Sequence, residues 1–509
     1  MNFNFSEVVS EQPKKLFSTE LTVLSTVSDA ESGGVKKILA VSAEPRILSA
    51  EYSDGGIKTM GRVNFKMFYI DAEDHLKNLD YFNDFTNFAP SEDLAGQRIA
   101  VFHSSVEVSA KTDLTVKLGA RIILDFYASE KNQVQGLVNP PDGVYSEYAC
   151  GKVSKFAAYL EQSATFDDEQ ETRSAVDGIM MYENSVVLTD VKTSDGSFKV
   201  TGKIVSTVCY LSGDDIKKIE FDVPFDEEYL NSSVCSGQTA FGFAEVKTAR
   251  IILGGDDKKN VIKSEITLNF NFWTYETEEI KYVRDLYSAK LELTPETCAL
   301  KTGTALAAER FDRKVSGSVT LSDDFSAIRQ TVEVLGVRNN VANVSVIRGS
   351  DDENDCVKYR IEGIIEANVV YTDENGLNSV AAEIPYSETF DSKNRGNVVP
   401  IAFSGIAENA FARVKGDRKI EVTAEAVFAV SSVKTDELDL ICKVTEGEAR
   451  PQNESAFSVY IAEEGDGVWE VAKAMTARPD EITAQNPELV FPLKAGDRAV
   501  IYRKLDENE

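Results

Sequence analysis

Few side chains of the kinds that carry out catalysis are present in this sequence. Its 509 residues include only two histidines, His75 and His103. His103 precedes Ser104 and Ser105, and a serine beside a histidine could act as a nucleophile with the histidine as general base. No Gly-x-Ser-x-Gly turn, which exposes the nucleophilic serine of many hydrolases, surrounds these serines. We therefore predict no catalytic residues and no enzyme activity.

The acidic and glycine-rich segments do not form a metal or phosphate motif. Residues 351–353 and 213–215 offer carboxylates, but the spacing of a calcium-binding EF-hand loop is missing. Residues 254–259 lack the Gly-Lys-Ser/Thr of a phosphate-binding loop. Carboxylate pairs are too common in an acidic chain to indicate a glycosidase. The sequence predicts neither a metal site nor a cofactor.

The net charge limits the classes of partner. The chain has 54 Lys and Arg against 84 Asp and Glu, a formal net charge of −30. Such a surface repels nucleic-acid phosphates and anionic lipids, so we expect neither as a partner. It would suit solubility, which is the more common role of such a surface, or a partner protein with a basic face. No apolar run reaches the roughly 18 residues of a membrane span. The N-terminal segment has no basic start followed by an apolar stretch, so we expect no secretory signal.

The six cysteines lie far apart and form no Cys-x-x-Cys pair. This pattern matches neither a disulfide framework nor a zinc knuckle. We expect free thiols in a reducing cytoplasm.

Three segments of the chain share one strand-turn-strand frame. Residues 61–69, 202–210 and 363–371 each begin with glycine and end with tyrosine. An acidic turn follows each tyrosine, and then a second strand-like run that ends on an aromatic residue. These aromatic residues are Phe85, Phe225 and Tyr386, the last two preceded by proline. Apolar runs bounded by Asp, Gly and Asn turns predict β-hairpins.

The repeated frame predicts three domain-sized units. After each hairpin comes a further strand-like segment, at residues 114–127, 266–273 and 420–430, and the last of these alternates apolar and polar residues as a half-buried strand does. We place the repeats at residues 1–146, 147–301 and 302–448, with an exposed turn near the first junction at residues 139–143. We expect a mainly β multidomain protein whose repeats are either strung along the chain or docked together.

Residues 449–509 carry a different pattern. A strand is predicted at 457–461, a helix beginning near Val468, a second short helix beginning at Pro479, and a last strand at 499–502. Asn486-Pro487 ends the second helix. We therefore expect a small βααβ C-terminal domain.

Both patterns resemble known domains. The Gly-to-Tyr strand, acidic turn and Pro-aromatic strand end resemble the SPOCS domain of clostridial spore-coat proteins, which has no established active site. The first copy departs most, because it lacks the proline. Gly465-Asp466-x-Val468-Trp469, Asn486-Pro487 and Leu493-x-x-Gly496 resemble the signature of a LysM domain.

LysM domains bind N-acetylglucosamine polymers in a groove between two loops, and the resemblance places the groove here at residues 463–469 and 486–493. The candidate residues for binding a glycan or a partner are Glu463, Glu464, Gly465, Asp466, Gly467, Val468, Trp469, Asn486, Pro487, Glu488 and Leu489.

This groove departs from the LysM pattern. Gly467 stands where Thr or Ser is usual, which removes a hydroxyl that could cap the helix or bond a sugar. Glu463, Glu464 and Asp466 are not needed by a neutral glycan but would suit a basic protein patch. Trp469 is either a core residue or a sugar platform.

The domain order resembles that of spore-coat morphogenetic proteins. The resemblance implies a non-enzymatic adaptor in the mother-cell cytoplasm, at the forespore surface or in the spore coat. Its LysM-like end would dock onto the coat-basement ATPase, and its β-rich repeats would scaffold assembly. Exposed strand edges are candidate sites of self-association. The alternative is a peptidoglycan-binding protein of the cell wall or cortex.

Overall fold

The computed structural model describes residues 1–28, 32–91, 94, 97–112, 115–255, 259–323, 325–348, 356–451 and 455–502. Antiparallel strands account for most of these residues, so the predicted mainly β class is confirmed. The acidic run at 351–353 lies outside the described residues.

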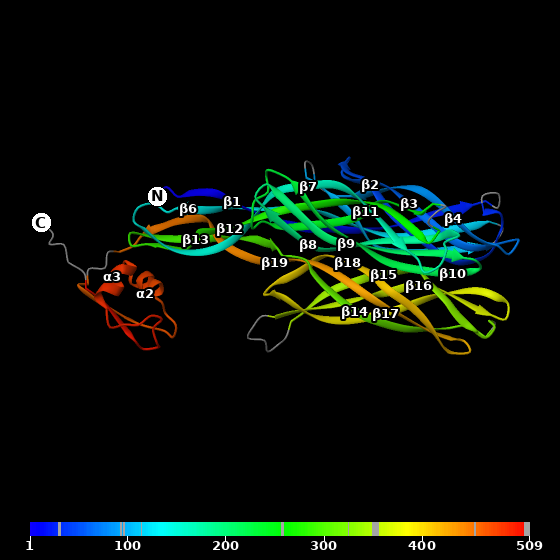
Figure 1. The fold of residues 1–509 in the computed structure, drawn as a ribbon. Helices are drawn as coiled ribbons and strands as arrows, with labels where there is room; N and C mark the ends of the chain where they lie inside the picture. The colour runs from blue at the N-terminus through cyan, green and yellow to red at the C-terminus, as the bar shows by residue number, and fades with distance from the viewer. Residues whose placement is uncertain are drawn as a thin grey trace.

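Six sheets form three two-layer sandwiches with the same connectivity (Figure 1). In each sandwich the last strand lies at the centre of one sheet, and three consecutive strands form the other as a meander. Sandwich 1 consists of β1 (Asn4–Val27), β6 (Val116–Asn139) and β5 (Ala100–Thr112) against β2 (Val35–Ser53), β3 (Gly56–Asp71) and β4 (Leu76–Pro90).

Sandwich 2 consists of β7 (Val144–Glu171), β12 (Val261–Ser288) and β11 (Thr239–Leu253) against β8 (Gly178–Ser194), β9 (Ser197–Ser212) and β10 (Asp215–Leu230). In sandwich 3 the first strand is split into β13 (Leu291–Ala305) and β14 (Glu309–Thr320). Both pair with β19 (Lys419–Ala449), which also pairs with β18 (Val398–Gly416). The second sheet is β15 (Gln330–Arg348), β16 (Cys356–Asp373) and β17 (Gly376–Arg395).

The chain passes from one sandwich to the next at residues 140–143 and 289–290. The predicted limits at 146/147 and 301/302 therefore fall inside β7 and β13. The reason is that the shared hairpin marks the middle of each sandwich, whereas its first strand carries no shared motif.

The glycine and the aromatic residue of the shared frame are cross-strand partners. Gly61 lies opposite Phe85, and the same register joins Gly202 to Phe225 and Gly363 to Tyr386. A Cβ at Gly61 would stand 2.2 Å from the Phe85 ring and 2.7 Å from a backbone oxygen of the neighbouring strand. Only glycine leaves room for the ring to lie over the strand.

The tyrosine of the frame and the residue before it point to opposite faces, as strand alternation requires. Tyr69 lies in the core of sandwich 1, whereas Phe68 lies in a separate apolar cluster. Cys209 and Val370, which also precede the tyrosines of their frames, lie in that same cluster. We call it the axial cluster; its buried members are Leu39, Ala40, Phe68, Met181, Cys209, Ile216, Leu335 and Val370. It joins all three sandwiches.

Polar contacts close the three sandwiches into a ring. Lys66 of sandwich 1 donates to the Tyr182 carbonyl of sandwich 2 at 2.9 Å. Lys218 of sandwich 2 donates to the Ala410 carbonyl of sandwich 3 at 2.7 Å. The amide of Asn340 in sandwich 3 bonds both the N–H and the carbonyl of Val106 in sandwich 1. Each sandwich therefore contacts the other two.

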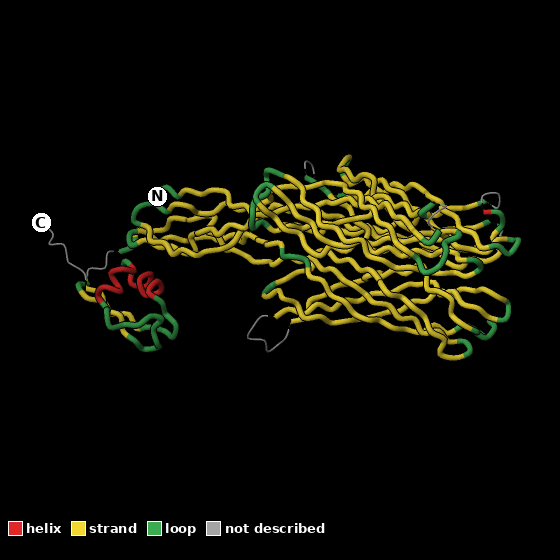
Figure 2. The backbone as a smooth tube through the Cα atoms, in the orientation of Figure 1, coloured by secondary structure: helices red, strands yellow, loops and turns green. Residues whose placement is uncertain are grey.

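The first and last strands of each sandwich continue beyond it as two-stranded ribbons, visible at one end of Figure 2. We call these three ribbons the stalk; they pair residues 4–12 with 130–139, 144–155 with 276–288, and 291–301 with 437–449. Two apolar clusters fill the space between the ribbons and include Leu137, Val283, Leu300 and Ile441. The stalk thus has its own core, which explains strands as long as 31 residues.

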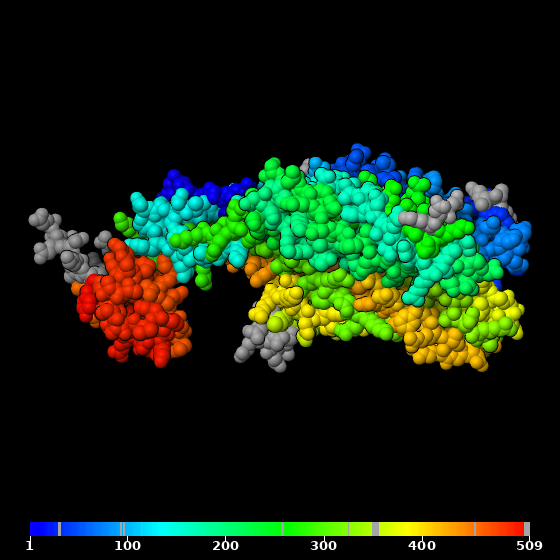
Figure 3. All heavy atoms as spheres, viewed as in Figure 1, coloured from blue at the N-terminus to red at the C-terminus, as the bar shows by residue number. Residues whose placement is uncertain are grey.

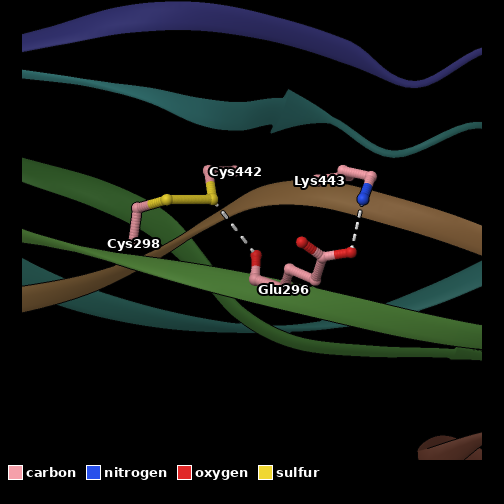
Figure 4. The surroundings of a disulfide bond; sticks show 4 residues. All are labelled: Glu296, Cys298, Cys442 and Lys443. Atoms are coloured by element: carbon pink, nitrogen blue, oxygen red, sulfur yellow. Dashed lines mark hydrogen bonds and ion pairs between the residues drawn. A yellow bond between two sulfur atoms is a disulfide. The ribbon is translucent and has the colours of Figure 1, made fainter.

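The expectation that all six cysteines are free thiols is wrong. Cys298 and Cys442 form a disulfide between β13 and β19 in the stalk (Figure 4), although 144 positions separate them in sequence. The pairing of these two strands brings the thiols together, and no sequence spacing signals it. The remaining cysteines, Cys150, Cys209, Cys235 and Cys356, are free.

The C-terminal module lies at the stalk end, clear of the sandwiches (Figure 3). It comprises β20 (Phe457–Ile461), α2 (Val468–Met475), α3 (Pro479–Gln485) and β21 (Arg498–Tyr502). The two strands pair antiparallel, and the helices pack against one face of this sheet through Val471, Ile482 and Ile501.

The axial cluster should contribute strongly to stability. We expect Phe68→Ala to lower the free energy of unfolding by about 3–5 kcal/mol, because it leaves a cavity among buried residues of all three sandwiches. Phe82→Ala, at an exposed position on the neighbouring strand, is the matched control and should cost about 1 kcal/mol or less. Urea unfolding of both variants measures this, and equal losses would contradict the role of the cluster.

Candidate functional site

One residue of the predicted groove, Trp469, contacts the stalk. The indole N–H of Trp469 donates to Asp285 at 2.8 Å, and its ring meets Tyr287 edge-on with centroids 5.0 Å apart. Both partners lie at the stalk end of β12. Trp469 therefore binds another part of the same chain.

Asp285 is the charged centre of this docking contact. It also accepts hydrogen bonds from Lys473 of α2 at 2.6 and 2.8 Å. Burial alone would raise the pKa of Asp285, but the bonds from Lys473 and Trp469 outweigh it and hold the pKa below its usual value. The hydroxyl of Tyr287 donates to the Ala477 carbonyl, which fixes the module from a second side.

Several of the predicted groove residues stabilise the module itself. Asn486 is buried, donates to the Ile482 and Val500 carbonyls, and accepts the Val500 N–H. Asp466 accepts hydrogen bonds from the Tyr460 hydroxyl and the Glu463 N–H. These contacts occupy side chains that the resemblance assigned to ligand binding.

The rest of the groove is accessible in part. The exposed residues are Glu463, Glu464, Gly465, Pro487 and Glu488. Gly467, Val468 and Leu489 are half-buried. The Gly467 N–H donates to Glu470, which is the half of a capping box that does not need a hydroxyl at position 467. The accessible side chains that carry charge are therefore all acidic.

The module also exposes an apolar face that the predicted site did not include. On the side of the sheet away from the helices, Phe457, Val459 and Ile461 alternate along β20 and are 51%, 45% and 65% exposed. Tyr502 of β21 is 63% exposed and packs against Phe457, with the ring centroids 5.4 Å apart. We call these four side chains the apolar face. The strand alternation of residues 457–461 was the signal for it.

A second site lies where the three sandwiches meet. A cavity there is lined by six strands that form sheet edges, β2 and β5, β8 and β11, and β15 and β18, and by the central strand β19. The centres of water molecules can occupy about 270 Å³ of it. Glu44, Arg46, Glu183 and Arg338 are among its charged lining residues.

Most of these charges are paired. Glu44 accepts from Lys66 at 2.7 Å and lies 3.5 Å from Arg46. Arg338 lies 3.8 Å from Glu183 and 3.8 Å from Glu366. Burial raises the pKa of Glu183 and of Glu366, and Arg338 offsets part of that rise.

In one pair of titratable residues in the cavity, His103 and Glu245, the effect of burial is not offset by hydrogen bonds between the facing atoms. His103 Nδ1 of β5 and Glu245 Oε1 of β11 are 3.7 Å apart, and neither atom has a hydrogen-bond partner in the part of the chain that the structure describes. Burial lowers the pKa of His103 to about 4 and raises the pKa of Glu245 to about 8. Both groups are therefore neutral at pH 7.

In the sequence, His103 is notable only for the two serines that follow it. Ser104 and Ser105 also line the cavity. The available signal was different: Phe102, Phe243 and Phe403 occur at nearly the same distance after each shared glycine, and all three line this cavity. Glu245 could be assigned to it only once the fold was known.

The comparisons with known proteins identify no relative. No protein-family model, curated protein or solved structure matches the chain. Within the described ranges there is no cluster of three or more His, Cys, Asp or Glu side chains that could hold a metal ion. No helix among the described residues is long and apolar enough to span a membrane.

Loss of Asp285 should release the module from the stalk. We expect Asp285→Ala to weaken docking by about 2–3 kcal/mol, because the charge-assisted hydrogen bonds to Trp469 and Lys473 are lost. Trp469 would then meet water, so its fluorescence should shift to longer wavelength and become more sensitive to acrylamide, while the buried Trp273 is unaffected. Glu279→Ala, at an exposed position of the same strand, is the control; an unchanged spectrum in Asp285→Ala would contradict the docking contact.

Glu245 should make stability fall as pH rises. The unfolded carboxyl ionises near 4.5 and the folded one near 8, so between these values the folded state holds the extra proton. From pH 6.5 to 8 we expect wild type to lose about 2 kcal/mol relative to Glu245→Gln, and the contribution of His103 cancels because both proteins contain it. Urea unfolding across this pH window tests it, and parallel curves for the two proteins would contradict the assignment.

Proposed function

We propose that the chain is a non-enzymatic structural adaptor. Its C-terminal module docks a partner protein, and its three sandwiches, which we interpret as three SPOCS-like repeats, form a scaffold. We interpret the module as LysM-like. Family resemblance suggests the coat-basement ATPase of the spore as the partner, and the mother-cell side of the forespore surface or the spore coat as the place of action.

The docking of Trp469 onto the stalk is the observation that carries this proposal. A glycan platform needs an aromatic face open to solvent, but this ring packs on Tyr287 and its N–H is occupied by Asp285. The apolar face, in contrast, is open. Adjacent apolar side chains of this kind, together with acidic loops, suit a protein surface better than a sugar polymer.

The construction of the remaining chain supports a scaffold. The axial cluster and the ring of hydrogen bonds join the three sandwiches, and the stalk core joins the same chain segments further along. The module is attached to the stalk by Asp285 and Tyr287. A partner bound to the module is therefore held at a fixed position relative to the sandwiches.

Substitutions on the apolar face test the proposal. We expect Ile461→Asp and Val459→Asp to abolish binding of the purified coat-basement ATPase, because a carboxylate would be buried at the interface. Leu230→Asp is the matched control, since Leu230 is 87% exposed on β10 of sandwich 2. Binding that survives both Ile461→Asp and deletion of residues 455–509 would exclude the module as the docking site.

Sedimentation with purified peptidoglycan decides between the two classes of ligand. The proposal predicts that the chain stays in the supernatant. Saturable co-sedimentation that is lost on changing residues 463–469 would instead establish the alternative, a cell-wall or cortex protein.

A further inference from the structure

The cavity between the sandwiches contains a small site in which two facing polar atoms lack hydrogen-bond partners among the described residues. Glu245 and His103 come from different sandwiches, β11 of the second and β5 of the first. Their facing atoms, Oε1 and Nδ1, are 3.7 Å apart, too far for a hydrogen bond to each other. Buried polar atoms without partners are costly, so a site that keeps two of them together calls for a ligand.

Both atoms are suited to accept hydrogen bonds. A neutral histidine can accept at Nδ1, and Glu245, which is protonated in the empty cavity, accepts only once it has lost that proton. A group placed between them must therefore supply at least two N–H or O–H donors. A protonated amine has up to three donors, and its positive charge compensates an ionised Glu245.

Aromatic rings form the adjacent wall. Phe102 and Phe243 stack with centroids 4.7 Å apart, and the Phe102 ring also stacks on His103 at 5.4 Å. The faces of such rings attract cations and their surfaces accommodate methylene groups. The wall and the two acceptors together match a short alkyl chain that ends in an ammonium group.

We propose that this part of the cavity binds a small organic cation with a protonated amine. Its N–H groups bond to Glu245 Oε1 and His103 Nδ1, and its carbon chain lies against Phe102 and Phe243. The space available to water centres, about 270 Å³, far exceeds the roughly 10–15 Å³ that a single water needs. The cavity is therefore large enough for a short diamine.

The neighbouring charges favour a cation over an anion. Arg46 and Lys66 are already bound by Glu44, and the guanidinium of Arg338 lies between Glu183 and Glu366. Each of these three cations thus lies within 4.0 Å of a carboxylate, although Nε and Nη1 of Arg338 make no hydrogen bond among the described residues. The ion-pair partner of Glu245, in contrast, is the neutral His103. An anionic ligand would meet carboxylates on three strands.

Calorimetric titration of the full chain with putrescine at pH 7.5 tests the proposal. We expect saturable binding to wild type and at least a tenfold weaker affinity for Glu245→Gln and for His103→Phe. Glu276→Gln, which removes one carboxylate from an exposed position of β12, should bind like wild type. Repeating the titration in buffers with different ionisation enthalpies should show release of up to one proton per bound putrescine, since binding ionises Glu245.

Equal affinities of wild type, Glu245→Gln and Glu276→Gln would show that putrescine binds the acidic surface at large, and would overturn the proposal. No heat of binding at millimolar putrescine would overturn it as well. Inorganic phosphate serves as the anionic probe, and binding of phosphate that depends on His103 would reverse the assigned charge of the ligand. If Glu245→Gln fails to fold, His103→Phe alone decides the outcome.

Discussion

The structure depends on how the edge strands of three open sandwiches are covered. An edge strand carries unpaired backbone groups that tend to pair with other chains. Here six edge strands turn toward a shared axis, where the axial cluster and amides such as Asn340 hold them. The ring keeps these edges from pairing with the strands of other chains. It also creates the polar cavity, because edges that meet through side chains do not close into a continuous ladder.

The sequence predicts the local part of this arrangement well. The glycine, tyrosine and aromatic residues of the shared frame locate the hairpins, and their register explains why these residue types recur. Alternation also indicates that Phe68, Cys209 and Val370 face away from the tyrosines. It cannot indicate what covers them, since periodicity assigns a residue to a face of a strand and not to a neighbour. The axial cluster was therefore beyond prediction.

The same limit applies to the candidate sites. Trp469 was open to two interpretations, core residue or sugar platform, and the structure adds a third, a contact with residues of β12. The disulfide between Cys298 and Cys442 and the pair formed by His103 and Glu245 likewise join distant segments. Each depends on strand pairing or sandwich packing that a single sequence does not encode in any short spacing. The apolar face differs, because alternation within β20 alone produces it.

The three sandwiches share a core pattern but differ on their outer faces. In sandwich 1 the outward side chains beside the shared frame include Met60, Phe82 and Phe88, all of them exposed. The corresponding positions of sandwich 2 are Thr201, Asp222 and Glu228, and those of sandwich 3 are Glu362, Glu383 and Thr389. The frame fixes the backbone through residues that are buried, so the exposed positions can diverge without cost to the fold. A scaffold built in this way presents three different surfaces in fixed relative positions, and contacts on more than one of them would reinforce each other through effective concentration.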